Sequence, residues 1–292
     1  MASLKEVKNR ITSVQSTRKI TSAMKMVASA KLHKAQGAIE NMLPYQQKLN
    51  KILTNFLCAD LEVVSPFVVE REVKRVAIVA ISSNSSLCGG YNANVQRMLL
   101  QAVEEYRELG QDNILVFPIG RKVEEATKKM GFAPQGSYQT LSDKPTYEEA
   151  SALATKLMEL FLAKEIDQVE LIYHHFKSMG VQMLLCERYL PIDLTRVAQE
   201  AADGERQSVN DYIVEPSAEE LIAQLIPTVL CQKIFTSALD SNASEHAART
   251  LAMQMATENA NELIQDLTKQ YNKGRQQAIT NELLDIIGGS MA

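Results

Sequence analysis

The stretch RKITSAMKMVASAKLHKA, residues 18–35, decides how the ends of this chain fold. Its Ala, Met, Lys and Ser residues are compatible with a helix, and it contains no Gly or Pro that would end one. The apolar stripe is thin, because Thr21, Met24 and Ala28 stand where a packed bundle would place Leu or Ile. We therefore expect a helix with a small, positively charged surface.

The helical pattern extends on both sides of this stretch. Four apolar residues recur at intervals of three and four: Leu4, Val7, Ile11 and Val14. The pattern covers residues 2–57, interrupted only by Gly37 and Pro44. A single helix of this length would measure roughly 80 Å.

A second long helical pattern follows EPSAEE and runs to Gly288, with Ser217 as its expected N-cap and Pro227 as a possible kink. Its expected stripe consists of Leu239, Ala243, Ala247, Leu251, Met255, Leu263, Leu267, Ile279, Leu283 and Ile287. Helices of this length cannot wrap around an ordinary core. We expect the two to form an antiparallel coiled coil.

Strand and helix patterns alternate between the two long helices. The expected strands are 74–82, 113–120, 168–176 and 181–190, and helical stretches at 93–109, 121–130 and 147–164 separate the first three. This alternation predicts a parallel, Rossmann-like α/β sheet. The last two strands are joined only by KSMG, which predicts a hairpin with an antiparallel edge. The expected divisions are a helix at 1–58, an α/β domain at 72–195, a connection at 196–216 and a helix at 217–292.

The charge is distributed unevenly along the chain. The net charge is −4, yet the first forty residues contain eight basic residues and only Glu6 and Glu40 as acids. The basic residues are Lys5, Lys8, Arg10, Arg18, Lys19, Lys25, Lys31 and Lys34. This surface is expected to meet a negatively charged partner. Nucleic acid is not expected, because aromatic residues make up only 5% of the chain.

Cysteine spacing and hydropathy indicate the environment. Cys58, Cys88, Cys186 and Cys231 have no metal-ligand spacing and are expected to be structural thiols in a reducing compartment. The sequence shows no apolar run that approaches the length of a membrane span, and its start resembles neither a signal peptide nor a transit sequence. Any action at a membrane is therefore expected to proceed through a partner.

No motif in the chain predicts a catalytic, cofactor or metal site. The loop SSNSSLCGGYNANV, residues 82–95, follows a strand and precedes a helix, but it has neither the Lys-Ser/Thr of a P-loop nor a full GxGxxG. Gly89 and Gly90 are expected to form a tight turn. His174 and His175 lie in a strand, so their rings point to opposite faces and cannot chelate one ion. Two alternatives stay open, a nucleotide-binding α/β protein dimerised by its helices and a coiled-coil scaffold.

Three separated motifs carry a family resemblance. They are IxSVQxTxKITxAMxMVAxxKxxKA, SLCGGxNxN and AARxxAMxxATxNAxxLIxxLxxxYNKxRQxxITxELxxI, in this order along essentially the whole chain. Together they resemble the gamma subunits of bacterial F-type rotary ATP synthases. The resemblance implies a non-catalytic central-stalk rotor, one copy per complex. Its coil would turn inside a hexamer of alternating alpha and beta subunits, and its α/β foot would rest on the membrane c ring beside epsilon, at the cytoplasmic face of the inner membrane.

The resemblance also implies contact residues. Contacts with alpha and beta subunits would come from Lys19, Met24, Lys25, Lys31, Lys34, Arg249, Arg275, Gln276, Thr280 and Glu282. Contacts with the c ring would come from Asp211, Tyr212 and Glu215, and the tip, 283–291, would lie in an apolar collar. The chain departs from the family at 84–86, where Asn-Ser-Ser replaces a charged DRG, and it has no dithiol insertion for redox control.

Overall fold

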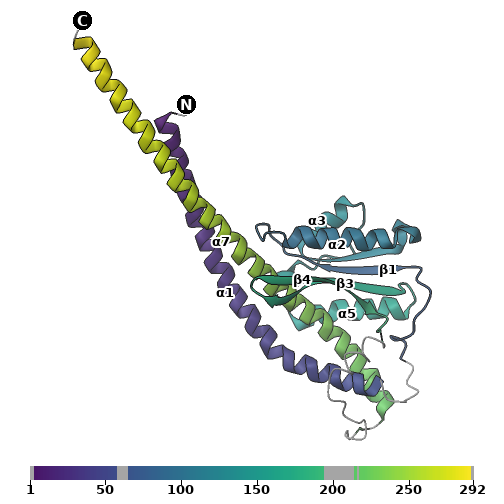
Figure 1. The fold of residues 1–292 in the computed structure, drawn as a ribbon. Coiled ribbons are helices and arrows are strands. Elements are labelled where there is room, and N and C mark those ends of the chain that lie inside the picture. The colour runs from purple at the N-terminus through teal and green to yellow at the C-terminus, as the bar shows by residue number, and fades with distance from the viewer. Residues whose placement is uncertain (1–2, 58–64, 194–213, 216, 291–292) are drawn as a thin grey trace. The chain divides into compact units, whose positions relative to one another are not determined.

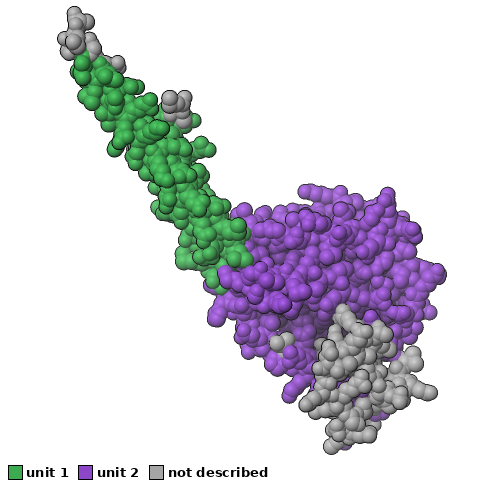
Figure 2. Space-filling model, viewed as in Figure 1, with its two compact units in different colours: residues 1–29, 249–292 green, residues 30–248 purple. Residues whose placement is uncertain are grey.

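The computed structural model forms two compact units. It describes residues 3–57, 65–193, 214–215 and 217–290. One unit comprises residues 1–29 and 249–292, and the other comprises residues 30–248 (Figure 2). The two long helices, α1 (Leu4–Leu57) and α7 (Ala218–Ser290), each contribute to both units (Figure 1).

Both long helices are confirmed. Helix α1 has 54 residues and α7 has 73. Pro44 lies inside α1 and Pro227 lies inside α7. Ser217 caps α7 as predicted, because its Oγ accepts a hydrogen bond from the backbone N–H of Glu220 at 3.2 Å.

The larger unit contains a four-stranded sheet of order β2-β1-β3-β4. The strands are β1 (Val76–Ile81), β2 (Ile114–Ile119), β3 (Gln168–Ser178) and β4 (Val181–Leu190). Strand β1 pairs in parallel with β2 and β3, and Val79 lies opposite both Phe117 and Leu171. Strands β3 and β4 form an antiparallel hairpin. The parallel sheet with an antiparallel edge is therefore confirmed.

Shorter helices connect the strands. They are α2 (Tyr91–Glu105), α3 (Arg121–Lys129), α4 (Gln139–Asp143) and α5 (Tyr147–Leu162), with 3₁₀ turns η1 (Arg107–Leu109) and η2 (Gln111–Asn113). The first predicted helix, 93–109, ends earlier than expected. Turn η1 carries the chain from Tyr106 to Gly110, whose φ of 86° favours glycine. The sequence pattern missed α4 because that helix is a single short turn.

Helices cover both faces of the sheet (Figure 1). On one face, α2 and α3 contribute Val95, Leu99 and Val123 to a core that also contains Ile78 and Val116. On the other face, α5, α7 and the end of α1 pack against the sheet. The large buried side chains of this second core include Phe56, Phe117, Leu153, Leu157, Phe161, Leu171, Ile226 and Ile234. Because both faces are covered, all six residues of β1 are buried.

In the smaller unit, α1 and α7 run antiparallel. Arg18 Nη1 donates to Asn261 Oδ1 at 3.1 Å, and the hydroxyl oxygens of Thr21 and Thr257 lie 2.8 Å apart. A Cβ added at Gly274 would lie 3.2 Å from Leu4. Residue numbers thus fall along α1 as they rise along α7, which confirms an antiparallel coil.

The expected stripe of α7 is partly wrong in this unit. Its least exposed residues alternate steps of three and four: Thr250, Met253, Thr257, Ala260, Ile264, Leu267, Tyr271, Gly274 and Ala278. Met255 is 61% exposed and Leu263 is 44% exposed, although both were expected in the apolar stripe that faces α1. On a helix with 3.6 residues per turn, each step of four residues rotates the position by about 40°. Repeated steps of four therefore leave the face that contacts α1, whereas a coiled coil keeps a 3.5-residue repeat.

Within Glu219–Leu284, α7 contains one window that is apolar enough to cross a membrane by length and composition, with a mean hydropathy of 1.3. The expectation that no such window exists is therefore wrong. Of this window, 44% is buried inside the protein, and Ile222, Ile226 and Ile234 lie in the core. A helix that supplies a protein core has the same composition.

Candidate functional site: the sheet crevice and the coil surface

The loop after β1 lies where open α/β sheets bind ligands. Strand β1 lies between β2 and β3: the connection after β1 leads to β2 on one side, and the connection after β2 crosses back past β1 to β3 on the other. Ligands of such sheets bind at this switch point, outside the carboxyl ends of the strands. Residues 82–90 form the loop at this point.

Hydrogen bonds within the chain close this loop. Asn92, in the first turn of α2, accepts the backbone N–H of Ser83 at 3.1 Å and donates to Ser83 Oγ at 2.8 Å. The same amide donates to the carbonyl of Ser85 and contacts Cys88 Sγ at 3.1 Å. Gly89 has a φ of 59°, as a tight turn requires. The loop polar groups therefore bind each other.

Helix α7 covers the crevice. The Tyr91 hydroxyl donates to the carbonyl of Ser241 at 3.0 Å, and the backbone N–H of His174 donates to Ser241 Oγ at 3.2 Å. Asn242 Nδ2 donates to the carbonyl of Ser142 at 2.9 Å. The rings of Tyr91 and His174 stack with centroids 4.3 Å apart. A segment of the chain itself thus occupies the usual ligand position.

The two adjacent histidines point to opposite faces, as predicted. His174 is 3% exposed, and burial lowers its pKa to about 4, so it is neutral at neutral pH. His175 is exposed, and its Nδ1 lies 2.8 Å from Asp240 Oδ2. Burial raises the pKa of Asp240, and the facing His175 opposes that shift in part.

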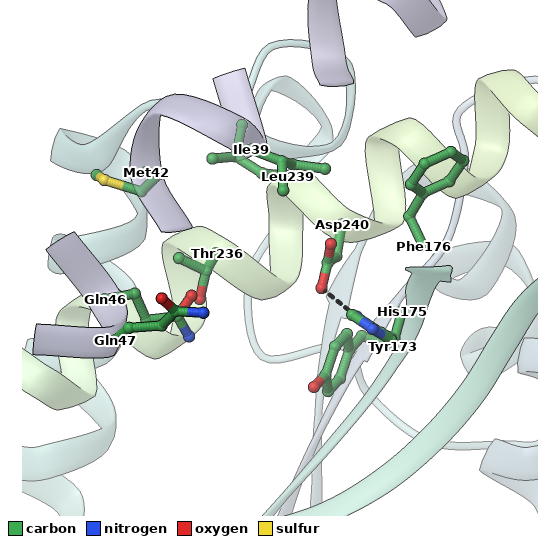
Figure 3. Close-up of a pocket in the computed structure, with 10 residues that line it drawn as sticks. All are labelled: Ile39, Met42, Gln46, Gln47, Tyr173, His175, Phe176, Thr236, Leu239 and Asp240. Atoms are coloured by element: carbon green, nitrogen blue, oxygen red, sulfur yellow. Dashed lines mark hydrogen bonds and ion pairs between the residues drawn. The ribbon is translucent and has the colours of Figure 1, made fainter. Parts of the chain in front are cut away.

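A pocket of about 350 Å³ lies beside this ion pair, between α1, β3 and α7 (Figure 3). Ile39 and Met42 from α1, Phe176 from β3 and Leu239 from α7 supply its apolar lining. The His175–Asp240 pair lies at its edge (Figure 3). The arrangement contains no nucleophile paired with a base.

None of the cysteines in the described part of the chain forms a disulfide. Cys88 and Cys231 are buried. Cys186 lies with its Sγ 3.4 Å from Glu170 Oε2, and burial of the sulfur, followed by this carboxylate, raises its pKa to about 12. Among the described residues, no cluster of three or more His, Cys, Asp or Glu could hold a metal ion. Cys58 lies outside the described residues.

The structure places the predicted contact residues on different kinds of surface. Lys19, Lys31, Lys34, Arg275, Gln276, Thr280 and Glu282 are exposed, whereas Met24 and Lys25 are half-buried. Arg249 is only 8% exposed. Glu215 is exposed, and Asp211 and Tyr212 lie outside the described residues.

Sequence reasoning missed two groups of residues. Ile20, Met26 and Val27 are exposed apolar side chains on α1, beside the predicted lysines. Their positions off the 3–4 repeat of α1 are the signal that could have identified them. The second group is the polar face of α7 around Ser241 and Asn242, for which the sequence carries no clear signal.

These features define a class of protein that combines a two-helix coil, with exposed lysines on α1, and an α/β domain whose ligand crevice is filled. A family model described as ATP synthase matches residues 3–292. The chain is 80% identical over 292 residues to the ATP synthase gamma chain of Bacteroides fragilis, covering all of both chains. It is 75% identical to that of Bacteroides thetaiotaomicron, again with full coverage of both chains.

Solved structures share the fold. A chain in the rotor of the Euglena gracilis mitochondrial ATP synthase matches with a TM-score of 0.64 at 18% identity, covering 94% of this chain and 98% of that one. A chain in that enzyme's OSCP, F1 and c-ring assembly matches with a TM-score of 0.65 at 18% identity, covering 99% and 94%. The chain belongs to the family of ATP synthase gamma chains. It is thus a subunit of a membrane-associated ATP synthase complex.

Proposed function

We propose that this chain is the central-stalk rotor of an F-type ATP synthase. The coil of α1 and α7 turns inside a hexamer of three alpha and three beta subunits, with one copy of this chain per complex. The α/β domain, residues 72–195, is the foot that rests on the c ring beside epsilon, with residues 196–216 as the connection. Rotation driven by ions through the c ring is thereby coupled to ATP synthesis, and hydrolysis drives the reverse.

One observation carries this proposal: the coil has an end that no other described part of the chain covers. Leu4 faces Gly274 near the start of α1, and α7 continues to Ser290, about 24 Å further at 1.5 Å per residue (Figure 1). Four large apolar residues are exposed in the last part of this extension, after Glu282: Leu283, Leu284, Ile286 and Ile287. An apolar collar at the top of the hexamer would bury them.

The basic residues of α1 suit contacts that break at each step. Exposed ion pairs contribute only about 0–1 kcal/mol each, so acidic loops of successive beta subunits can bind and release them. We propose Lys19, Met24, Lys25, Lys31 and Lys34 for this role. We propose Arg275, Gln276, Thr280 and Glu282 as the contact patch of α7. Arg249 is proposed for the same set, and its burial limits any such contact to a small part of its side chain.

The subunit itself carries out no chemistry in this proposal and needs no cofactor or metal. Its asymmetric coil presents a different face to each of three identical catalytic sites, and its angle decides which site is open and which is closed. The main rival is a nucleotide-binding α/β protein. The crevice argues against it, because Tyr91, Ser241 and Asn242 fill the place where a nucleotide would bind. Specific ATP binding by the isolated chain would favour that rival.

At the membrane, the chain acts only through the c ring, on the cytoplasmic face of the inner membrane. We propose that Asp211, Tyr212 and Glu215 contact the polar loops of the ring. Asn84, which replaces the charged residue of the family, bonds to the first residues of helices α3 and α4. Its side chain donates to the carbonyl of Gln139 at 2.7 Å and accepts the N–H of Arg121 at 2.8 Å.

Co-expression with the alpha and beta subunits of the same organism tests the proposal. We expect a purified, ATP-hydrolysing complex whose mass corresponds to three alpha, three beta and one copy of this chain. A homodimer without affinity for those subunits would overturn it. A scaffold would still bind its partners after deletion of residues 72–195, whereas a rotor would lose its connection to the c ring.

A further inference from the structure

The face of α7 that meets the α/β domain is unusually polar for a buried helix face. Six polar residues within 237–246 are buried: Ser237, Ser241, Asn242, Ser244, Glu245 and His246. Buried polar groups destabilise a fold unless they are hydrogen-bonded. We call the polar contacts of α7 between Leu230 and Ser244 the seam, and all of them lie within the larger unit.

The seam begins with bonds to the β3–β4 hairpin. The buried Tyr189 hydroxyl donates to the carbonyl of Leu230 at 2.9 Å. One turn later, Lys233 Nζ lies 2.7 Å from Glu187 Oε2 and 3.2 Å from the hydroxyl of Tyr173. These bonds hold α7 against the edge of the sheet.

Further along α7, the contacts come from other directions. Ser241 accepts hydrogen bonds from Tyr91 of α2 and from the backbone of His174 in β3. Asn242 donates to the carbonyl of Ser142 in α4, and Ser244 Oγ donates to the carbonyl of His174 at 3.4 Å. The seam thus spans about 20 Å of helix and is bonded to four elements of the domain.

Directional bonds restrict movements that apolar packing alone would permit. If α7 turned about its axis or slid along it, several buried donors and acceptors would lose their partners together, and each unsatisfied group would destabilise the new position. Apolar side chains have no such directional requirement, and repacked apolar cores retain stability more readily than a unique arrangement. The seam therefore favours one rotation of α7 about its own axis and one position along that axis.

We propose that the seam is the joint that transmits torque between the α/β domain and α7, and that its buried bonds prevent the helix from turning in its seat. This inference rests on the proposed rotor function. Tyr91 and Asn242 are positioning residues in this joint, because each donates to a main-chain carbonyl across it. They fill the crevice that a ligand would otherwise occupy.

A double variant with a matched control tests the joint. Tyr91→Phe with Asn242→Ala removes two donors and keeps the ring that stacks on His174. The control, Tyr106→Phe with Asn113→Ala, makes the same two changes at hydrogen bonds that do not involve α7, to Glu170 and to the carbonyl of Leu109.

The measurement is rotation of the complete complex of alpha, beta and this chain, with the hexamer immobilised and beads of increasing size attached to the α/β domain. Torque generated by ATP hydrolysis then reaches the bead through the packing of α1 and α7 against the α/β domain and through the seam. We expect the seam variant to rotate as the wild type does with small beads and to develop torque lower by on the order of twofold, with slips, against large beads. The control should match the wild type at every load.

Each result bears on the proposal separately. Equal torque at all loads for the seam variant and the wild type would overturn the joint, and so would equal losses in the seam and control variants. If the double variant fails to assemble, Tyr91→Phe alone is measured, and unchanged torque with reduced thermal stability would also overturn the joint. Failure of the wild-type chain to assemble or rotate would instead contradict the proposed function.

Discussion

Helix α7 has two regions with opposite surfaces. Before residue 249 it is largely buried, and it combines isoleucines in the core with the polar seam. After residue 249 it is mostly exposed and contacts α1 along a narrow line of small and polar residues such as Thr257, Ala260 and Gly274. One continuous helix can therefore be fixed in a domain over its first part and expose its side chains to other subunits over its second part.

The largest contrast between the two regions is expected from identical substitutions. Ile234→Ala removes a fully buried side chain and should lower the free energy of unfolding by about 2–5 kcal/mol. Ile279→Ala, at a side chain that is about half exposed, should change it by less than about 0.5 kcal/mol. Chemical denaturation of both variants measures the difference. Equal effects would show that the two regions are anchored alike.

The buried region should also respond to acid through His174. Its pKa is lowered to about 4 in the folded chain from an ordinary 6.5, so the unfolded chain binds more protons between these values. Stability should therefore fall as the pH decreases through this window, by about 3 kcal/mol in total.

His174→Phe should remove this loss while retaining an aromatic ring against Tyr91. Asp240, whose pKa is raised, contributes with the opposite sign over the acid range, so the difference between wild type and variant is the quantity to measure. His33→Gln, on the exposed face of α1, is the control. A wild-type acid dependence that survives in His174→Phe would contradict the assignment.

On α1, in the coil that it forms with the exposed region of α7, Met24→Lys should affect coupling more than folding. The side chain is half-buried beside Lys25, and a lysine there would form an additional ion pair with an acidic loop of a beta subunit, worth on the order of 1 kcal/mol. Such a contact would hold the rotor at each stop. The test is ATP synthesised per ion translocated by the purified complex, and a normal ratio would show that the contact assignment is wrong.

The smallest effect is expected inside the coil, at Thr21 and Thr257. Replacing either residue by Val removes one partner of a hydrogen bond and should cost about 1 kcal/mol, whereas the double replacement should be nearly neutral. A double-mutant cycle on unfolding measures the coupling between the two sites. Strictly additive effects would mean that the pair does not help set the register of the helices.

Much of the fold could be predicted from local patterns. The boundaries of all four strands agree with the expected ones to within two residues, and Ser217 caps α7 as predicted. The misplaced residues of the coil have one physical origin. Met255 and Leu263 were expected to face α1 because the expected stripe advances in steps of four, whereas two supercoiled helices select a 3.5-residue repeat.

The proposed contact residues could be located from sequence motifs, but their exposure could not. Arg249 and Lys19 both belong to these motifs, yet one is buried and the other is exposed. Neither local pattern nor charge distinguishes them, because burial depends on what packs against the helix. Their roles in contacting other subunits stay predictions.

The sequence by itself determined the two long helices, the parallel sheet with its hairpin edge and the family, because these follow from periodicity, capping and motifs within short stretches of chain. Only the tertiary structure decided that α7 fills the crevice of the sheet and that Tyr91 and Asn242 bond across it. These pairs lie about 100 residues or more apart in the chain, as with Asn242 and Ser142. Serine and asparagine side chains can bond to solvent, to their own helix or to a distant carbonyl, so local sequence does not reveal which partner they take.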